Sequence, residues 1–341
     1  MLDRSGSAGS FPLLTEGKVA SPVPSGRIDT LGFSFDVESN FQVRGGSVAI
    51  DGFGTAEERF RVRHGLPGGG FLNLGIGGKA WVEASLPKRI DGRNVEAVGV
   101  PEALEIARDV YEEAGLFCTP RADGKRFELS RLVRLDPVRD FDGVAHVTEL
   151  LNGLAAVPRD SRYKVRRFAD PERNRAESMR VGPNAWASQL YDKHVESKGD
   201  AAAGRLRYEG RFHREQLESA FAKANGCVMG RIVDVREDKV QRLTRASFER
   251  VGFDREVLGK ASVAEAVFGC DWLSRRQQAE LWTYLTAPGA AARMGRNAAS
   301  RYRRTAQELG VTMAAAEEEA ADVFVRLDFD KGTEVFRADV A

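Results

Sequence analysis

Several features that mark common classes of protein are missing from this sequence. Its three cysteines, Cys118, Cys227 and Cys270, lie far apart, so neither a disulfide framework nor a metal-binding spacing is indicated. We expect free thiols in a reducing compartment. No apolar run approaches the roughly 18 residues of a membrane span, and the N-terminus lacks a basic-then-apolar signal pattern. A cytoplasmic protein with no membrane partner is therefore expected.

The sequence also lacks a large net charge of either sign. The chain has 341 residues with 51 Lys and Arg against 50 Asp and Glu, a formal net charge of +1. Any surface for nucleic acid must therefore be local. Hydrophobic residues make up 42% of the sequence, which supports a sizeable core rather than disorder. The length suggests about two domains.

Two familiar site types are also excluded. The glycine-rich stretch 68–79 is not a P-loop, because Asn73 stands where the first glycine belongs and Ala80 replaces the Ser or Thr that binds magnesium. The four histidines show no paired spacing, so a histidine zinc site is not expected. Residues 64–79 are expected to form turns. The chemistry should then need neither bound ATP nor zinc.

Hydrophobic periodicity divides the rest of the chain into a mixed first part and a helical second part. We predict a strand over 27–37, a helix over 101–114 with Pro101 in its first turn and Gly115 as its C-terminal cap, and no internal sequence repeat. Further expected strands, the last three forming an antiparallel meander, cover residues 81–86, 127–136, 176–181, 186–193 and 205–212. Further expected helices lie near residues 146–156, 214–224, 244–251, 262–268, 274–286, 289–309 and 313–322.

These patterns predict an α+β fold in which an antiparallel-sheet core precedes a helical C-terminal region. Residues 1–26 are expected to be a flexible arm. Residues 27–213 are expected to form the α+β catalytic domain, because every candidate for chemistry lies there. Residues 214–341 are expected to form a helical DNA-binding region.

One group of residues could cleave a phosphodiester bond. Alternate residues of a strand share a face, so Tyr191 and Lys193 should point the same way, with Glu209 on the neighbouring strand. A free tyrosine has a pKa near 10, so a nucleophilic tyrosine needs a nearby cation, and Lys193 is placed to help. The spacing alone also allows Tyr191 to be an ordinary strand aromatic beside a solvated turn.

The segment around Tyr191 resembles the tyrosine motif of rolling-circle replication initiators of the filamentous-phage gene II and plasmid replication initiation factor group. Five pieces between about residue 27 and residue 313 occur in the order of that family, although none is specific by itself. They are Ile28-Asp29 with Phe33-Ser34-Phe35; Glu83-Ala84-Ser85-Leu86-Pro87-Lys88; Arg134-Leu135-Asp136 with Asp140-Phe141; Leu190-Tyr191-Asp192-Lys193 with Glu196 and Leu206-Arg207-Tyr208-Glu209-Gly210-Arg211; and Ser300-Arg301-Tyr302-Arg303-Arg304.

The resemblance implies an enzyme that nicks one strand of a replication origin, forms a 5′-phosphotyrosyl intermediate, leaves a 3′-hydroxyl primer and rejoins the ends. It makes Tyr191 and Lys193 catalytic candidates, with Mg²⁺ or Mn²⁺ as cofactor. Because paired histidines are absent, the metal candidates are Asp136, Glu209 and Glu83. Each of these carboxylates could instead be a strand-end ion-pair partner.

Basic residues interleaved with aromatics predict a DNA surface. The stretch 159–180 includes Tyr163 and Phe168, and a second basic group lies on the expected helix 289–309. Either stretch could equally be a solvated charged face. The DNA-binding candidates are Arg162, Lys164, Arg166, Arg167, Arg207, Arg211, Arg301, Arg303 and Arg304.

The expected partners are origin DNA and single-stranded DNA, together with a host helicase and a DNA polymerase. Two other functions remain open: a non-catalytic DNA-binding regulator of replication or transcription, and a relaxase or transposase with the same chemistry. The presence of the intact segment Leu190-Tyr191-Asp192-Lys193 together with Glu209 favours an enzyme over a non-catalytic regulator.

Overall fold

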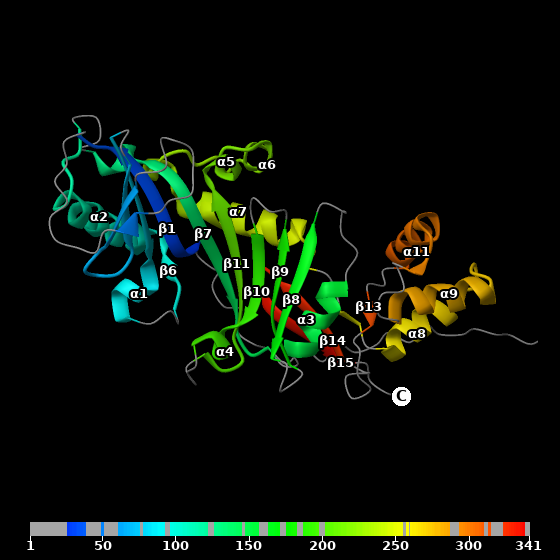
Figure 1. The fold of residues 1–341 in the computed structure, drawn as a ribbon. Helices are drawn as coiled ribbons and strands as arrows, with labels where there is room; N and C mark the ends of the chain where they lie inside the picture. Colours follow the sequence, from blue (N-terminus) through cyan, green and yellow to red (C-terminus); the bar gives the residue numbers. More distant parts are fainter. Residues whose placement is uncertain are drawn as a thin grey trace, which may run out of the picture.

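The chain forms a broad twisted sheet with helices on one face and a smaller module at one end (Figure 1). The computed structural model describes residues 26–38, 49–50, 61–75, 78–92, 96–121, 126–144, 147–156, 163–170, 175–182, 187–197, 202–254, 257–258, 260–286, 293–309, 313–314 and 323–337. The fold is α+β, with a large antiparallel sheet and several helices.

The described part of the chain contains an eleven-stranded sheet whose strands run in the order β2-β3-β4-β5-β1-β7-β11-β10-β9-β8, with β6 also paired to β1. The first five strands are β1 (Arg27–Asp36), β2 (Ala49–Ile50), β3 (Arg61–Gly65), β4 (Phe71–Gly75) and β5 (Lys79–Ser85). The others are β6 (Val98–Gly99), β7 (Arg131–Phe141), β8 (Lys164–Asp170), β9 (Arg175–Gly182), β10 (Ala187–Asp192) and β11 (Leu206–His213).

The sheet is built from two halves with the same topology. In each half a long strand, β1 or β7, is followed by a meander that runs from the sheet edge back to the long strand. We call β1–β5 repeat I and β7–β11 repeat II. Since β1 and β7 pair antiparallel with Leu31 opposite Leu135, the halves are related by an approximate two-fold axis at that pair. A repeat that the sequence did not predict is therefore present in the backbone.

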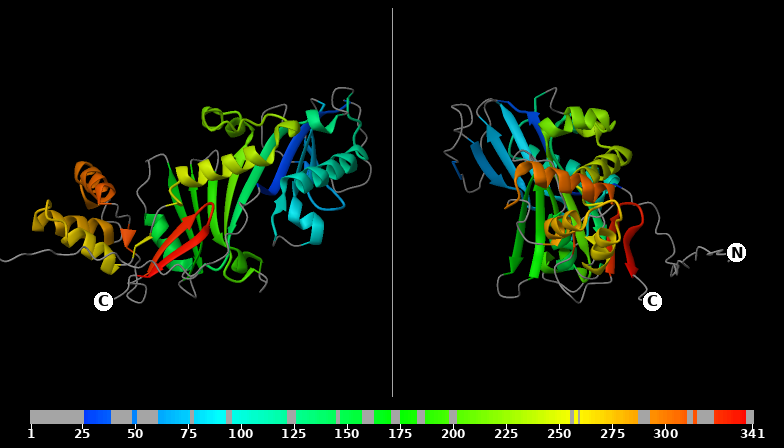
Figure 2. Two further views of the ribbon diagram at one scale, coloured as in Figure 1. Left: turned by 180° about the vertical axis from the view of Figure 1, so that it is seen from behind. Right: turned by 90° about the vertical axis from the view of Figure 1, so that its right-hand side faces the viewer.

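The helices lie on one face of this sheet (Figure 2). They include α1 (Leu86–Asp91), α2 (Val100–Gly115), α3 (Val147–Ala156), α5 (Arg214–Leu217), α6 (Ala220–Ala224) and α7 (Glu237–Arg250), with short 3₁₀ turns at Phe127–Leu129 and Ile232–Asp234. The short helix α4 (Lys193–Ser197) lies instead at the end of β10. Helices α2 and α7 follow repeats I and II and share one core with β1 and β7. In β1 the residues Leu31, Phe33 and Phe35 face that core at the two-residue period of a strand. The alternate side chains therefore face the opposite, helix-free side.

The hydrophobic core of the sheet continues past residue 213, where the sequence predicts a domain boundary. Leu217, Met229 and Val240 are buried in the same core as β1, and Phe248 and Phe253 complete the second core. The sequence turns helical at 214 because these helices cover the sheet, which a local pattern cannot distinguish from a new domain. A separate core begins only with the module that follows.

That module has its own hydrophobic core, formed by α8 (Lys260–Phe268), α9 (Arg275–Thr286) and α11 (Arg296–Glu308). The C-terminal region is not wholly helical. A small sheet contains β12 (Val257–Leu258), β13 (Met313–Ala314), β14 (Val323–Asp328) and β15 (Gly332–Arg337), in the order β13-β12-β14-β15. Leu327 and Phe329 of its hairpin pack into the core of repeat II. A helix was expected over 313–322, but residues 313–314 form strand β13. Residues 315–322 lie outside the described residues.

The glycine-rich stretch expected to be turns contains the end of β3, all of β4 and the first residue of β5. It turns at residues 66–70, where Gly69 and Gly70 take positive φ angles of 91° and 104° that favour glycine, and again at Gly78, whose φ is 70°. The alternation of Leu72 and Leu74, both buried, indicates the strand that the glycine count concealed. No helix in the described residues is long and apolar enough to cross a bilayer. The expected arm, residues 1–26, lies outside the described residues except for Gly26.

Candidate active site

Polar side chains converge on the helix-free face where repeat II meets β1. Opposite residues of an antiparallel pair share a face. One row of paired residues therefore places Asp140, Arg207 and Tyr191 side by side on β7, β11 and β10. The next row contains Glu209, paired with Val138 on one side and with Gln189 on the other. The predicted meander is confirmed, and it brings Tyr191 and Glu209 together.

Tyr191 is almost completely buried, and in the described part of the chain its hydroxyl is hydrogen-bonded to a carboxylate. The hydroxyl donates to Glu209 Oε2 at 3.2 Å. Burial is the main cause that raises the pKa of Tyr191, and the charge of Glu209 raises it further, while Arg207 lowers it. In this state the tyrosine is a neutral phenol hydrogen-bonded to a group that can accept its proton.

Glu209 and Asp136 lie on adjacent strands and are joined by Arg211. Arg211 Nη2 is 3.4 Å from Glu209 Oε1, and Arg211 Nε is 3.5 Å from Asp136 Oδ2. Burial raises the pKa of Glu209 to about 7, with further contributions from the charges of Asp136 and Asp29. Burial likewise raises the pKa of Asp136, against the effect of Arg134. At both carboxyls, burial thus outweighs the nearby arginines and favours the protonated form.

Asp29 is a third member of this group that the sequence reasoning did not single out. It is 5% exposed, and its Oδ1 is buried without a hydrogen-bond partner, 3.6 Å from Arg207 Nη1. Thr30 donates to its other oxygen at 3.0 Å. The available signal was an acidic residue inside an apolar strand, since a buried carboxylate is costly unless it has a role.

Arg207, which was predicted to bind DNA, is fully buried. Its Nε and Nη2 bind Asp140 at 2.6 and 2.7 Å, and it also approaches Asp29. Ion pairing with Asp140 raises the pKa of Arg207 although burial, the largest single influence, opposes this. Arg207 is therefore held inside the site, next to Tyr191, rather than presented on a DNA-binding surface.

Lys193 was expected on the same strand face as Tyr191, but β10 ends at Asp192 and Lys193 begins helix α4. Its Nζ lies 5.5 Å from the centroid of the Tyr191 ring and binds Glu196 Oε2 at 2.6 Å. The lysine thus contacts the ring and not the hydroxyl. Burial lowers the pKa of Lys193, with the charge of Arg207 acting in the same direction. Among the contacts described, Arg207 is the cation that favours the phenolate.

Glu83 lies on β5, which is separated by β1 from β7 and β11, the strands of Asp136 and Glu209. It accepts from Arg134 Nη1 at 3.0 Å, and the same arginine binds Asp136 through Nε at 3.1 Å. Gly32 lies between them on β1, where a Cβ would be 3.0 Å from Arg134 Cβ and 3.1 Å from Glu83 Cγ. A side chain at position 32 would therefore disturb the bridge. Glu83 reaches Asp136 only through this arginine.

Basic residues of β8 and β9 extend the same face toward the sheet edge. Lys164 and Arg166 are exposed, and Arg166 pairs with Arg180, which pairs with Gln189 beside Glu209. Phe168, 52% exposed, pairs with Ser178, which pairs with Tyr191. Arg167 is exposed but pairs with buried Met179, so it points to the other face. Arg162 lies outside the described residues.

The C-terminal candidates lie on α11. Arg301 is exposed and its Nη2 is 3.6 Å from Glu280 of α9, while Arg304 is also exposed. The side chain of Arg303 lies outside the described residues. Tyr302 is buried in the core of the module and is not a stacking surface. The exposed positive charge of α11 among the described residues thus comes from arginines without an exposed ring between them.

The residue types of the site suit a hard divalent cation, but their present spacing does not. Asp29, Asp136 and Glu209 provide carboxylate oxygens, and one of these oxygens, Asp29 Oδ1, has no hydrogen-bond partner. Arg134 and Arg211, however, already bind Asp136. In the described residues no three His, Cys, Asp or Glu side chains are placed so as to hold a metal ion as they stand. A cation would require Arg211 or Arg134 to move.

Comparison with known proteins finds remote similarity among solved structures. No family model and no curated protein matches the chain. Among solved structures, the chain is similar to that of the rolling circle replication initiator protein from Geobacillus stearothermophilus, with 12% sequence identity, a TM-score of 0.29, and coverage of 86% of this chain and 99% of that chain.

Proposed function

We propose that this chain is a metal-dependent, site-specific DNA nickase and strand transferase that initiates rolling-circle replication, with Tyr191 as its nucleophile. The observation that supports this most strongly is the Tyr191 hydroxyl hydrogen-bonded to Glu209 beside two further buried acids, Asp29 and Asp136. A buried tyrosine in an ordinary core needs only one polar partner. Three acids around it, with raised pKa values for Asp136 and Glu209, are typical of a functional site.

The residues of the site suit a transesterification. The Tyr191 oxygen forms a bond to phosphorus, its proton passes to Glu209, and the bond from phosphorus to the 3′ oxygen breaks. The 3′ oxygen takes up a proton and leaves as the 3′-hydroxyl that primes synthesis. The phosphotyrosyl bond conserves the bond energy for rejoining, so no nucleotide cofactor is required. Glu209, with a pKa of about 7, is matched to a proton exchange near neutral pH.

A bound Mg²⁺ or Mn²⁺ would neutralise charge on the reacting phosphate. Asp29, Asp136 and Glu209 would hold it, with Arg211 displaced toward the phosphate. Arg211 is suited to this exchange because its side chain is 37% exposed and its buried Nε has no hydrogen-bond partner among the described residues. Glu83 would act indirectly, through Arg134.

A DNA strand would reach the site across repeat II. Lys164, Arg166 and Arg180 offer charge for phosphates, and Phe168 offers an exposed ring for a base. The origin duplex would be contacted by Arg301, Arg303 and Arg304 of the C-terminal module, so replacing these three with alanine should weaken duplex binding but not cleavage of a short single strand. Host helicase and DNA polymerase would act on the nicked product.

An end-labelled oligonucleotide tests the reaction and its polarity. Single-stranded DNA with a randomised central segment is labelled at either the 3′ or the 5′ end, incubated with Mg²⁺ or Mn²⁺, and resolved on a denaturing gel. The 3′ label should remain on the protein and the 5′ label should be released on the fragment with a free 3′-hydroxyl. Excess chelator should prevent adduct formation, and ATP should make no difference.

Other results would contradict the proposal in distinct ways. Retention of the 5′ label would mean a 3′-phosphotyrosyl enzyme, and an adduct formed at full yield in chelator would exclude the metal. DNA binding with no adduct under either metal would favour the non-catalytic regulator.

A further inference from the structure

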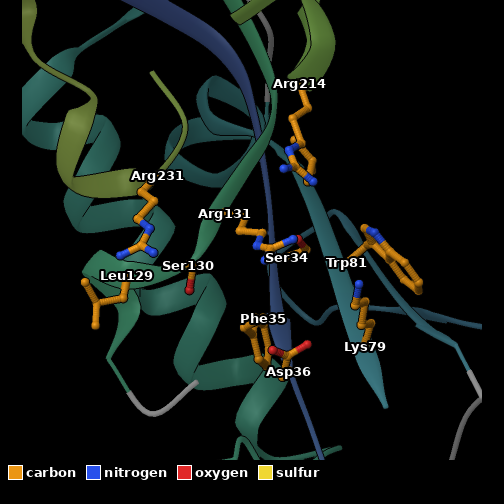
Figure 3. Close-up of a pocket in the computed structure, with 11 residues that line it drawn as sticks. Ser34, Phe35, Asp36, Lys79, Trp81, Leu129, Ser130, Arg131, Arg214 and Arg231 are labelled. Atoms are coloured by element: carbon orange, nitrogen blue, oxygen red, sulfur yellow. The ribbon is translucent and has the colours of Figure 1, made fainter. Parts of the chain in front are cut away.

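Repeat I contains a pocket of about 350 Å³ on the same helix-free face as the candidate site (Figure 3). It is lined by β1, β5 and the start of β7, with residues that follow β11 at its rim. Figure 3 shows Arg231 and Ser130 on one side, Trp81 and Lys79 on the other, and Arg214 above them. Residues from four separate parts of the chain thus converge on one space.

The pocket is strongly cationic. Lys79, Arg131, Arg214 and Arg231 line it, against one carboxylate, Asp36. Arg214 is 3.5 Å from Glu218, but no ion pair within the described residues involves Lys79, Arg131 or Arg231. Cations gathered without carboxylate partners repel one another, so this lining favours an anionic ligand.

A buried hydroxyl gives independent evidence of a ligand. Ser130 is 4% exposed and lines the pocket, and its Oγ has no hydrogen-bond partner. An unsatisfied buried hydroxyl costs on the order of 1–3 kcal/mol. A ligand oxygen in the pocket would remove that cost by accepting from Ser130.

The pocket is also the counterpart of the candidate active site under the two-fold relation of the repeats. Ser34 and Trp81 pair in repeat I as Val138 and Glu209 do in repeat II, three residues beyond the axis pair Leu31 and Leu135. Two residues further along β1 and β7, Asp36 pairs with Lys79 as Asp140 pairs with Arg207.

The counterparts of the reactive groups are missing from the pocket. Gly75 pairs with Lys79 at the position that Tyr191 takes beside Arg207. Trp81 stands in place of Glu209, and Gly32, one residue beyond the axis, stands in place of Asp136. The pocket therefore keeps a cation at the Arg207 position without a nucleophile, a proton acceptor or a carboxylate cluster.

We propose that this pocket is a second, non-cleaving DNA site that binds phosphates of the same strand whose scissile phosphate lies at Tyr191. The inference rests on the proposed function only in taking DNA as the ligand. The strand would meet Lys79, Arg131 and Arg231, with Ser130 donating to a phosphate oxygen and Trp81 forming an apolar rim.

The sheet geometry sets the separation of the two sites. From Ser34 to Arg27, which pairs with Val138, is seven residues along β1, and β5 and β11 lie three strands apart. At about 3.3 Å per residue and about 4.8 Å per strand, the sites are roughly 25 Å apart. That distance spans about seven nucleotides at the duplex rise of about 3.4 Å. Between them the face carries Arg134, which can screen the strand from Glu83 and Asp136.

The first experiment measures binding of a 20-nucleotide single strand by fluorescence anisotropy across a salt series, without metal so that no cleavage occurs. The variant Arg131→Ala/Arg231→Ala is compared with Arg242→Ala, which removes an exposed arginine from α7 on the opposite face. The pocket variant should bind at least tenfold more weakly at moderate salt, and its salt slope should fall by about two units, one per lost phosphate contact. The control should bind like the wild type.

The second experiment uses Ser130→Ala to separate ligand binding from structure. Because Ser130 Oγ has no partner in the free protein, the variant should have an unchanged or slightly raised melting temperature. It should nevertheless bind the 20-nucleotide strand several-fold more weakly. A merely structural serine would lower the melting temperature and leave affinity unchanged.

Competition with inorganic phosphate distinguishes a strand site from a site for a free anion. Wild-type affinity and slope in Arg131→Ala/Arg231→Ala would overturn the proposal, and so would a phosphate-binding pocket whose loss leaves the oligonucleotide affinity unchanged. Neither result depends on adduct formation, so failure of the nickase proposal would be seen separately, as the absence of an adduct in the wild-type protein.

Discussion

Repeats I and II place nearly the same backbone frame on one face of the sheet and fill it with different chemistry. In repeat II, Tyr191, Arg207 and Glu209 occupy two adjacent rows; Tyr191 and Arg207 are buried, and the side chain of Glu209 is 12% exposed. The same rows of repeat I carry Gly75, Lys79 and Trp81, which line or adjoin an open cationic pocket. The strand pairing thus creates the same position in both repeats, while burial and the carboxylates give repeat II its different chemistry.

The carboxylate partners of the two equivalent cations account for the closed site in repeat II and the open pocket in repeat I. Arg207 is neutralised by Asp140 and approached by Asp29, which allows a full charge to be buried. Lys79 is exposed and has no ion pair within the described residues. The buried half can hold a tyrosine away from water, and the open half is left with unpaired positive charge.

The largest expected effect is on stability, when the equivalent cations are exchanged for methionine. Arg207→Met would leave Asp140 and Asp29 buried without their cation, and should cost about 3–5 kcal/mol in the free energy of unfolding. The matched change Lys79→Met removes an exposed charge and should cost no more than about 0.5 kcal/mol. Urea unfolding of the two variants measures both. Similar losses in the free energy of unfolding for the two variants would contradict the difference in burial between Arg207 and Lys79.

The next effect is a pH dependence that belongs to repeat II alone. Burial raises the pKa of Glu209 from 4.5 to about 7, so the folded state holds its proton more tightly than the unfolded state. The associated stability is present below pH 4.5 and is lost as the pH rises through about 7, by about 3 kcal/mol. Glu209→Gln should flatten this decline in urea titrations, whereas Trp81→Phe at the equivalent position should keep it. An unchanged pH profile in Glu209→Gln would mean that another group titrates.

A smaller effect tests the bridge between the repeats. Gly32→Ala places a methyl group against Arg134 and Glu83 and should cost about 1–3 kcal/mol by overpacking. Gly65→Ala on β3 meets nothing within 4 Å and should be neutral within about 0.5 kcal/mol. Thermal unfolding compares them. Equal melting temperatures for the two variants would remove the requirement for glycine at position 32.

The local pattern predicted much of the sheet and part of the site. The meander 176–212 and helix α2 could be predicted because strand alternation and capping are local properties. The pairing of Tyr191 with Glu209 followed from the meander. The position of Asp29 near Asp136 could not be predicted from spacing, because β1 reaches Asp136 only through the pairing of Thr30 with Asp136, which are 106 positions apart in the sequence. The burial of Arg207 was equally hidden, since a strand pattern does not show which face is covered.

Two other differences have the same physical cause. Residues 214–254 look like a new helical domain in sequence, but their apolar faces pack on strands far earlier in the chain. The two-fold repeat left no trace in residue identity because its halves carry opposite chemistry, with Gly75 for Tyr191 and Gly32 for Asp136. Only the pairing register relates them.

The central claim is that Tyr191 is the nucleophile, and mass spectrometry of the protein–DNA adduct tests it most directly. After nuclease and protease digestion, the nucleotide-bearing peptide should contain Tyr191, and Tyr191→Phe should yield no modified peptide while binding DNA as the wild type does. Tyr208 should be unmodified, because it is fully buried between Ser188 and Ser247 and burial raises its pKa to about 12. Modification of Tyr208 or Tyr163, or an adduct that persists in Tyr191→Phe, would contradict the account.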